Sequence, residues 1–130
     1  MFSELAKIIL RAAVGIVFVY HGAQKLFGAF GGSGMEAFAK YLQSLGVPYP
    51  QVGAYLSGGA EFFCGLALIL GLLARWATLP LLVDMAVAIV TVHGSHGFNI
   101  VHKGYEYNMV LIAALLSILL TGSGKYSLKN

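Results

Sequence analysis

Long apolar runs, separated by short polar or glycine-rich segments, make up most of this chain. A helix rises about 1.5 Å per residue, so roughly 17–25 apolar residues are needed to cross about 30 Å of hydrocarbon. Runs of about that length cover roughly residues 5–27, 52–73, 76–94 and 105–120. The pattern predicts an all-α, polytopic membrane protein, with four transmembrane helices forming a bundle in a single domain of residues 1–130.

A shorter amphipathic segment separates the first two runs. Its apolar positions recur every three or four residues, at Met35, Phe38, Leu42 and Leu45. Ser33 and Glu36 match the capping box that begins a helix, and Gly46 and Pro48 mark its end. We therefore predict a helix over residues 34–45 that is too short to span a membrane. We expect it to lie at the membrane interface, with a lid over the mouth of the bundle as the alternative.

Composition supports the membrane assignment. Hydrophobic residues make up 58% of the chain and charged residues only 10%, with a mean hydropathy of +0.81. The net charge is +3, but the basic residues are scattered singly, which predicts the lipid bilayer and not nucleic acid as the partner. The single cysteine, Cys64, excludes a disulfide within the chain.

The Lys and Arg residues are unevenly divided between the two sides of the predicted bundle. The side of the N-terminus holds Lys7, Arg11, Arg75, Lys125 and Lys129, and the other side holds Lys25, Lys40 and Lys103. Loops rich in Lys and Arg stay on the cytoplasmic side of a membrane. We therefore predict a protein of the cytoplasmic (inner) membrane with both termini in the cytoplasm.

Three ionisable residues, Arg11, Glu61 and Asp84, fall well inside the predicted spans. Counted along ideal helices, the two acids lie within reach of the long arginine side chain. An isolated charge at such depth costs at least about 2.5–3.5 kcal/mol, so pairing is expected. We predict one charge network in which one acid is protonated, because a single arginine cannot balance two carboxylates. A purely structural ion pair is the alternative.

A second group of ionisable residues lies near the outer ends of the predicted spans. His21 and Lys25 are four residues apart and share one face of the first helix, and His93 and Glu106 come from later spans. On an ideal helical wheel, His93 is nearly opposite Asp84. His21 and Lys25 lie roughly 8 Å or more from the deep acids, which predicts the outer lip of a pocket with an acidic floor. A lysine that reaches the interface and solvated histidines are the alternative.

Several motifs follow one another along the chain. They are His21-Gly22-x-x-Lys25-Leu26, Glu61-x-x-x-Gly65-Leu66-x-Leu68-x-Leu70-Gly71-Leu72, Glu106-Tyr107-Asn108 and Gly122-x-Gly124-x-Tyr126-Ser127-Leu128, together with Arg11 and Arg75. On these residues the chain resembles the DoxX family of small membrane proteins over nearly its whole length. The resemblance implies a four-helix membrane bundle. The family usually ends its last motif with an aspartate, where this chain has Lys129.

The resemblance also implies redox chemistry at the membrane. Relatives of this type include a subunit of an archaeal thiosulfate:quinone oxidoreductase and membrane partners of soluble redox enzymes. The sequence has no Cys-x-x-Cys, dinucleotide fingerprint or phosphate loop, which argues against an enzyme with its own cofactor. We therefore expect an oxidoreductase subunit associated with a quinone or a small substrate, which works with a soluble or membrane redox partner.

Roles for individual residues follow from this hypothesis. The ligand-binding candidates are His21, Lys25, Glu61, Glu106 and His93. Of these, His21 and Lys25 would bind a quinone carbonyl or an anion. Glu61 and His21 are the catalytic candidates, and Glu61 would relay or balance a proton with Arg11 and Asp84.

Two other interpretations stay open at this point. The first is a non-enzymatic assembly or binding protein that docks a soluble partner. The second is a metal or haem site that uses His21 with His93 or His96. The wheel positions argue against the second, and we predict no metal ligands. The stripes of small residues suit packing within the chain or in a homo-oligomer.

Overall fold

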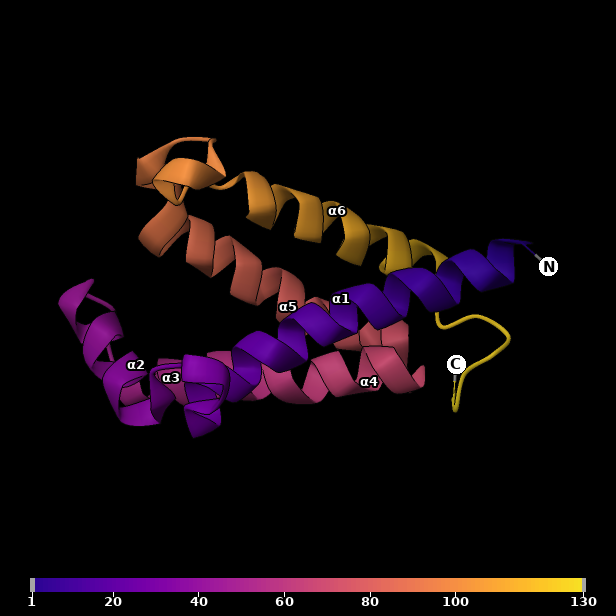
Figure 1. Ribbon diagram of the computed structural model, residues 1–130, viewed down its shortest axis with the longest axis horizontal. Helices are drawn as coiled ribbons and strands as arrows, with labels where there is room; N and C mark the ends of the chain where they lie inside the picture. Colours follow the sequence, from indigo (N-terminus) through magenta and orange to yellow (C-terminus); the bar gives the residue numbers. More distant parts are fainter. Residues whose placement is uncertain (1, 130) are drawn as a thin grey trace.

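Helices form nearly all the regular structure in a computed structural model that describes residues 2–129 (Figure 1). The α-helices are α1 (Phe2–Phe27), α2 (Gly34–Ser44), α3 (Pro50–Gly59), α4 (Gly65–Leu70), α5 (Ala74–Ala88) and α6 (Glu106–Thr121). Shorter turns of helix are η1 (Ala29–Gly31), η2 (Ala60–Cys64), η3 (Ile89–His93), η4 (Gly94–His96) and η5 (Ile100–His102). The chain is all-α, as its apolar pattern predicts.

Two longer helices arise because the backbone stays helical where shorter elements meet. One covers Pro50–Leu70 and contains α3, η2 and α4, and the other covers Ala74–His96 and contains α5, η3 and η4. Both are long and apolar enough to cross a membrane, judged by length and composition. Helix α6 is apolar but has only 16 residues. The structure therefore gives two candidate spans, and the four-span bundle stays a prediction.

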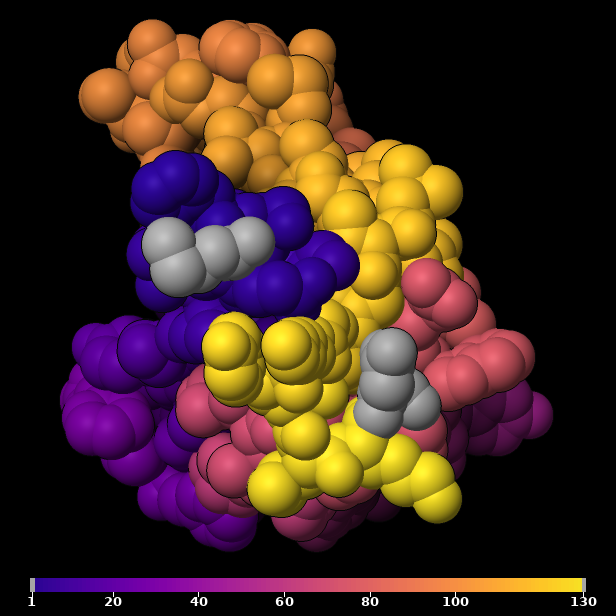
Figure 2. All heavy atoms as spheres, turned by 90° about the vertical axis from the view of Figure 1, so that its right-hand side faces the viewer, coloured from indigo at the N-terminus to yellow at the C-terminus, as the bar shows by residue number. Residues whose placement is uncertain are grey.

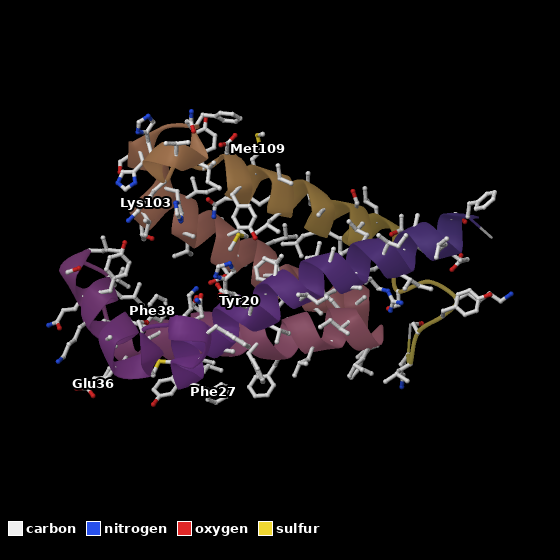
Figure 3. The ribbon with its side chains drawn as sticks, in the orientation of Figure 1. Tyr20, Phe27, Glu36, Phe38, Lys103 and Met109 are labelled. Atoms are coloured by element: carbon white, nitrogen blue, oxygen red, sulfur yellow. The ribbon has the colours of Figure 1, made fainter. Side chains whose placement is uncertain are left out.

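The connecting segments define two ends of the bundle. At the tail end, the start of α1, the turn between α4 and α5 and residues 122–129 come together (Figures 1 and 2). At the opposite, loop end lie α2 and residues 94–105 (Figure 1). Helices α5 and α6 pack against each other and diverge from α1 toward the loop end (Figure 1).

The core lies where α1 and α4 meet α5 and α6. Its fully buried side chains are Phe18, Leu68, Leu81, Leu115 and Ile118. Each of these helices contributes at least one of them, so the four elements pack around a common centre. Large apolar side chains also cover the outside of the bundle, including Ile16, Phe63, Val83, Val90, Val110 and Leu120. A surface this apolar is poorly suited to water and well suited to lipid.

Glycines set the register between α1 and the Pro50–Leu70 helix. A Cβ added at Gly22 would lie 2.5 Å from the backbone nitrogen of Phe62, and one at Gly65 would lie 2.9 Å from that of Val19. Such distances exclude a side chain, so the two backbones touch at these points. Gly58 lies against the side chains at the end of α1, with 3.4 Å between its added Cβ and the Cβ of Lys25. This register brings the end of α1 level with Glu61.

The chain's last residues fold back onto the tail end. Leu128 and Lys129 donate backbone hydrogen bonds to the carbonyls of Leu70 and Gly71, at 3.2 and 3.1 Å. The Lys125 backbone N–H donates to Glu4 Oε2 at 2.6 Å. This hydrogen bond, followed by one from the Lys7 side chain, holds the pKa of Glu4 below its usual value. The sequence predicted only a short polar tail here.

Helix α2 lies near its predicted position, but the predicted capping box does not form. Ser33 has helical backbone angles, and its hydroxyl donates to the carbonyl of Gly34 instead of accepting from a backbone N–H. The Glu36 side chain lies 3.7 Å from Lys40 on the exposed face. The amphipathic helix packs against α3, where Leu42 of α2 lies 3.6 Å from a Cβ added at Gly53.

Candidate functional site: a polar cavity inside the bundle

A cavity of about 210 Å³ lies among α1, η2, α5, η3 and α6 in the half of the bundle nearer the loop end. Its polar lining side chains are His21, Lys25, Glu61, His93, Tyr107 and Asn108. Apolar side chains that include Phe18, Met85 and Leu111 complete the lining. Four separate segments of the chain thus place polar groups around one space inside an otherwise apolar bundle.

An ion pair between Lys25 and Glu61 is the central contact of this site. Lys25 Nζ lies 2.6 Å from Glu61 Oε2, and the Glu61 residue is only 2% exposed. The ammonium group also lies 3.4 Å from Ser57 Oγ and 4.9 Å from the centre of the Phe38 ring. The loop-end lysine therefore contacts the deep acid directly, and the predicted separation of about 8 Å between them is wrong.

The register of the helices explains this correction. The prediction counted depth from the ends of the spans as if those ends were level. In the structure the glycine contacts set α1 against the Pro50–Leu70 helix so that Gly22 lies beside Phe62. A lysine side chain also points back toward the start of its own helix. Lys25 therefore reaches the level of Glu61.

Asp84 joins the same cluster through Ser57. The Ser57 hydroxyl donates to Asp84 Oδ1 at 2.6 Å, and the carboxyl groups of Asp84 and Glu61 lie within hydrogen-bonding reach of each other. Glu61 Oε1 and Asp84 Oδ2 are buried without a donor among the described residues. Lys25 supplies one positive charge for two acids. If one of the two acids is protonated, as predicted, its proton can be shared between Glu61 Oε1 and Asp84 Oδ2 and satisfies both oxygens.

Arg11 does not belong to this cluster, so its predicted network with Glu61 and Asp84 is wrong. Its side chain is buried at the tail end, where Nη2 donates to the backbone carbonyl of Tyr126 at 2.7 Å. The remaining guanidinium nitrogens, Nε and Nη1, have no hydrogen-bond partner in residues 2–129. Side chains in a helix point toward its start, so the Arg11 side chain extends away from the acids. Lys25, and not Arg11, is the cation that pairs with Glu61.

The orientation of His21 is set by its neighbour Gln24. The Gln24 amide nitrogen donates to the carbonyl of Phe30 at 3.3 Å, which turns its oxygen, Oε1, toward His21 Nδ1 at 3.2 Å. An amide oxygen can only accept, so Nδ1 carries the proton and donates. The nitrogen of His21 that stays available is Nε2.

His93 is held in the same way by a backbone carbonyl. Its Nδ1 lies 2.8 Å from the carbonyl oxygen of Lys103, which again fixes the proton on Nδ1. The ideal wheel placed His93 nearly opposite Asp84, and Asp84 is not among the residues that line the cavity. The π-helical turn η3 contains His93 and changes the phase of the helix there. Glu61 sits in the other π-helical turn, η2, so both distorted turns supply a side chain to the cavity.

Glu106 does not line the cavity, although it was predicted to bind a ligand there. Its Oε1 accepts from the backbone N–H of Ile100 at 2.6 Å, and its own N–H donates to the Phe98 carbonyl at 2.9 Å. The glutamate thus closes the loop that precedes α6. His96 and His102 lie in short exposed turns of that loop. Within residues 2–129, His, Cys, Asp and Glu side chains form no group of three that could hold a metal ion.

Three lining or linking residues were not predicted: Ser57, Tyr107 and Asn108. Ser57 lies one helical turn before Glu61, a spacing that places both residues on one face of the helix. Asn108 is 4% exposed, and its amide donates to the sulfur of Met85 at 3.6 Å. Tyr107 and Asn108 follow Glu106 in one of the motifs that resemble DoxX proteins. The motif was the available signal for Tyr107 and Asn108, but a role was predicted only for its glutamate, Glu106.

Comparisons with known proteins agree with the motifs. The DoxX family model matches residues 6–94. An uncharacterized membrane protein of Mycobacterium tuberculosis is 32% identical, with 93% of this chain and 77% of that protein covered. A Bacillus subtilis protein named "Putative oxidoreductase CatD" is 28% identical (92% and 81% covered), and the inner membrane protein YphA of Escherichia coli is 27% identical (93% and 86%). No solved structure matches the chain. The family match and these membrane relatives show that this chain is a membrane protein of the DoxX family.

Proposed function

We propose that this protein is a four-span subunit of a membrane redox system that binds a quinone head group, or a redox substrate of similar size, in the cavity. The observation that carries the proposal is the convergence of His21, His93 and the Lys25–Glu61 pair on one space inside the bundle. Buried ionisable groups in a membrane protein are costly and are typically retained for substrate or proton handling. One relative bears the name "Putative oxidoreductase CatD", which agrees with this class of function.

In this proposal, α1 and α6 complete the four spans and the tail end faces the cytoplasm. The ion pair and hydrogen bond between Glu4, Lys7 and Lys125 join the two termini at one end of the bundle. Arg75 is at this end too, because its Nε donates to the Leu119 carbonyl at 2.8 Å near the end of α6. The end richer in Lys and Arg is expected on the cytoplasmic side of the inner membrane.

The size of the cavity favours a small ligand. Pockets that enclose drug-sized ligands measure about 300–1,000 Å³, and this cavity measures about 210 Å³. A single substituted ring fits that space, while an isoprenoid chain would extend into lipid between the diverging helices. Electrons would pass between the bound quinone and the cofactor of a partner oxidoreductase, because the sequence carries no cofactor-binding motif of its own.

The proposal is tested by identifying the quinone that is purified together with the protein. The protein is purified with native lipid, and the extracted quinones are identified by mass spectrometry and counted per protein. The His21→Ala variant is compared with His102→Ala, which alters an exposed histidine outside the cavity. We expect quinone with the unaltered protein and with His102→Ala, and at least a several-fold loss with His21→Ala. A preparation of the unaltered protein that carries no quinone would contradict the proposal.

A further inference from the structure

We infer that the cavity takes its quinone in the reduced form, as a hydroquinone whose hydroxyl groups donate hydrogen bonds to side chains of the protein. This inference rests on the function proposed above and adds the redox form of the ligand. It follows from counting which polar atoms around the cavity are already bound and which are still available. A quinone carbonyl needs donors, whereas a hydroquinone hydroxyl needs acceptors.

Both histidines of the cavity have an acceptor available. His21 Nδ1 donates to the Gln24 side-chain oxygen, and His93 Nδ1 donates to the Lys103 carbonyl. When such a ring is neutral, its second nitrogen, Nε2, carries a lone pair. The contacts of these two lining residues therefore prepare each ring to accept a hydrogen bond from a ligand.

The acidic side of the cavity also presents an acceptor. Glu61 is almost completely buried and lines the cavity, and its Oε1 has no donor among the described residues. When a hydroxyl enters the cavity, it can donate to this oxygen in place of the proton that we predict Glu61 shares with Asp84. That proton then stays on Asp84, and the ligand is the donor to Glu61.

Most of the donors that line the cavity are already in use. Lys25 donates to Glu61 and Ser57, which occupies two of its three N–H groups, and Asn108 donates to the sulfur of Met85, which occupies one of its two amide hydrogens. A quinone carbonyl at Lys25 would also compete with the buried Glu61 carboxylate for the ammonium group, which is unfavourable. Among the described residues, Tyr107 supplies the one lining hydroxyl, and a phenol can accept as well as donate. The balance of available groups thus favours a ligand that brings its own donors.

The inference is tested with a matched pair of single-ring ligands, tetramethyl-1,4-benzoquinone and its hydroquinone. Binding of each to the full chain in nanodiscs is measured by equilibrium dialysis without oxygen, with empty nanodiscs as the blank for partition into lipid. We expect the hydroquinone to bind at least about tenfold more tightly, which corresponds to about 1.4 kcal/mol. Equal affinities, or tighter binding of the quinone, would overturn the inference and leave the proposed function standing.

Histidine variants locate the preference at the cavity. His93→Phe keeps a ring of similar size but removes the acceptor, and His102→Phe makes the same change on the exposed loop. We expect His93→Phe to lower hydroquinone affinity several-fold more than quinone affinity, and His102→Phe to change neither. A preference that survives in both His93→Phe and His21→Phe would contradict the assigned acceptors. If the unaltered protein binds neither ligand, the proposed function and this inference both fail.

Discussion

Two ends of this bundle bury charged side chains, and they do so in different ways. At the tail end, Arg11 is 3% exposed, donates to one backbone carbonyl and lies against Gly71. Toward the loop end, Lys25 pairs with Glu61 beside a cavity, and Ser57 links the pair to Asp84. Arg11 binds the tail, residues 122–129, to the bundle. Lys25 and Glu61, in contrast, place ionisable groups at the wall of the cavity. A buried charge is therefore a sign of function only when its surroundings leave room for a ligand.

The largest expected effect comes from breaking the ion pair near the loop end. Lys25→Met leaves the buried Glu61 carboxylate without its cation, which should cost about 3–5 kcal/mol of folding stability. Adding Glu61→Gln removes that uncompensated charge and should restore more than half of the loss. Unfolding of the purified variants in detergent measures both effects. A double variant no more stable than Lys25→Met alone would contradict the role of this pair.

At the tail end, the expected effect is large but steric. Gly71 has a φ of +70°, and an added Cβ would overlap Arg11 Nη1 and lie 2.5 Å from Ser127 Cβ. Gly71→Ala should cost about 3 kcal/mol, because left-handed strain adds to overpacking. Gly46→Ala is the matched control, since Gly46 has a φ of +82° with nothing within 4 Å of its added Cβ. It should lose only about 1–2 kcal/mol. Equal losses in the same unfolding assay would show that the tail packing contributes nothing.

Substitutions of Asp84 should have a smaller effect on stability than the loss of the Lys25–Glu61 pair. If Glu61 and Asp84 share one proton, Asp84→Asn keeps the hydrogen bonding without that proton and should change stability by less than about 1 kcal/mol. Infrared spectra should show a carboxylic acid C=O band that shifts in D₂O and disappears in Asp84→Asn. Asp84→Leu, which removes the acceptor for Ser57, should be less stable than Asp84→Asn. The absence of the band from the unaltered protein would mean that both acids are ionised.

The smallest effect is the pH dependence of the tail. The pKa of Glu4 is lowered by the Lys125 backbone N–H and then by Lys7, so the ionised carboxylate favours the docked tail. This stabilisation is fully present above the usual glutamate pKa of about 4.5 and is lost as the pH falls through the lower value in the folded protein. Hydrogen exchange at the Lys125 amide should therefore be faster in Glu4→Gln at neutral pH. Equal exchange in the two proteins would contradict the contact.

The positions of the helices could be predicted from the sequence because apolar periodicity is a local property. Helix α2 was expected over residues 34–45 and covers Gly34–Ser44. Glu61 was also expected inside the bundle, because it falls well within a predicted span, and it is 2% exposed. Helical wheels, and depths counted along each helix, assume ideal α-helices whose ends lie at the same height. The glycine contacts that set Gly22 beside Phe62, and the π-helical turn at His93, break both assumptions.

The partner of each buried charge was harder to predict, because it depends on contacts between distant parts of the chain. Arg11 was expected to meet the acids, but residues 122–129 fold back and offer it a backbone carbonyl 115 positions away. Glu106 was expected in the cavity, but it accepts from the loop before α6. In both cases the competing partner is a backbone group. Side-chain type and spacing carry no information about which backbone groups will be left unpaired.

The central claim is that the redox ligand binds in the cavity among α1, α5 and α6, and photo-crosslinking tests this most directly. A quinone with a photoreactive azide on its ring is bound to the protein in nanodiscs, irradiated, and the labelled peptides are sequenced. We predict label on residues 17–25, 85–93 and 107–111, reduced by excess unmodified ligand. A second, exposed groove lies between α2 and α3 and is lined by residues that include Met35, Ala39 and Tyr55. Label confined to that groove, or to the tail at residues 122–129, would contradict the account.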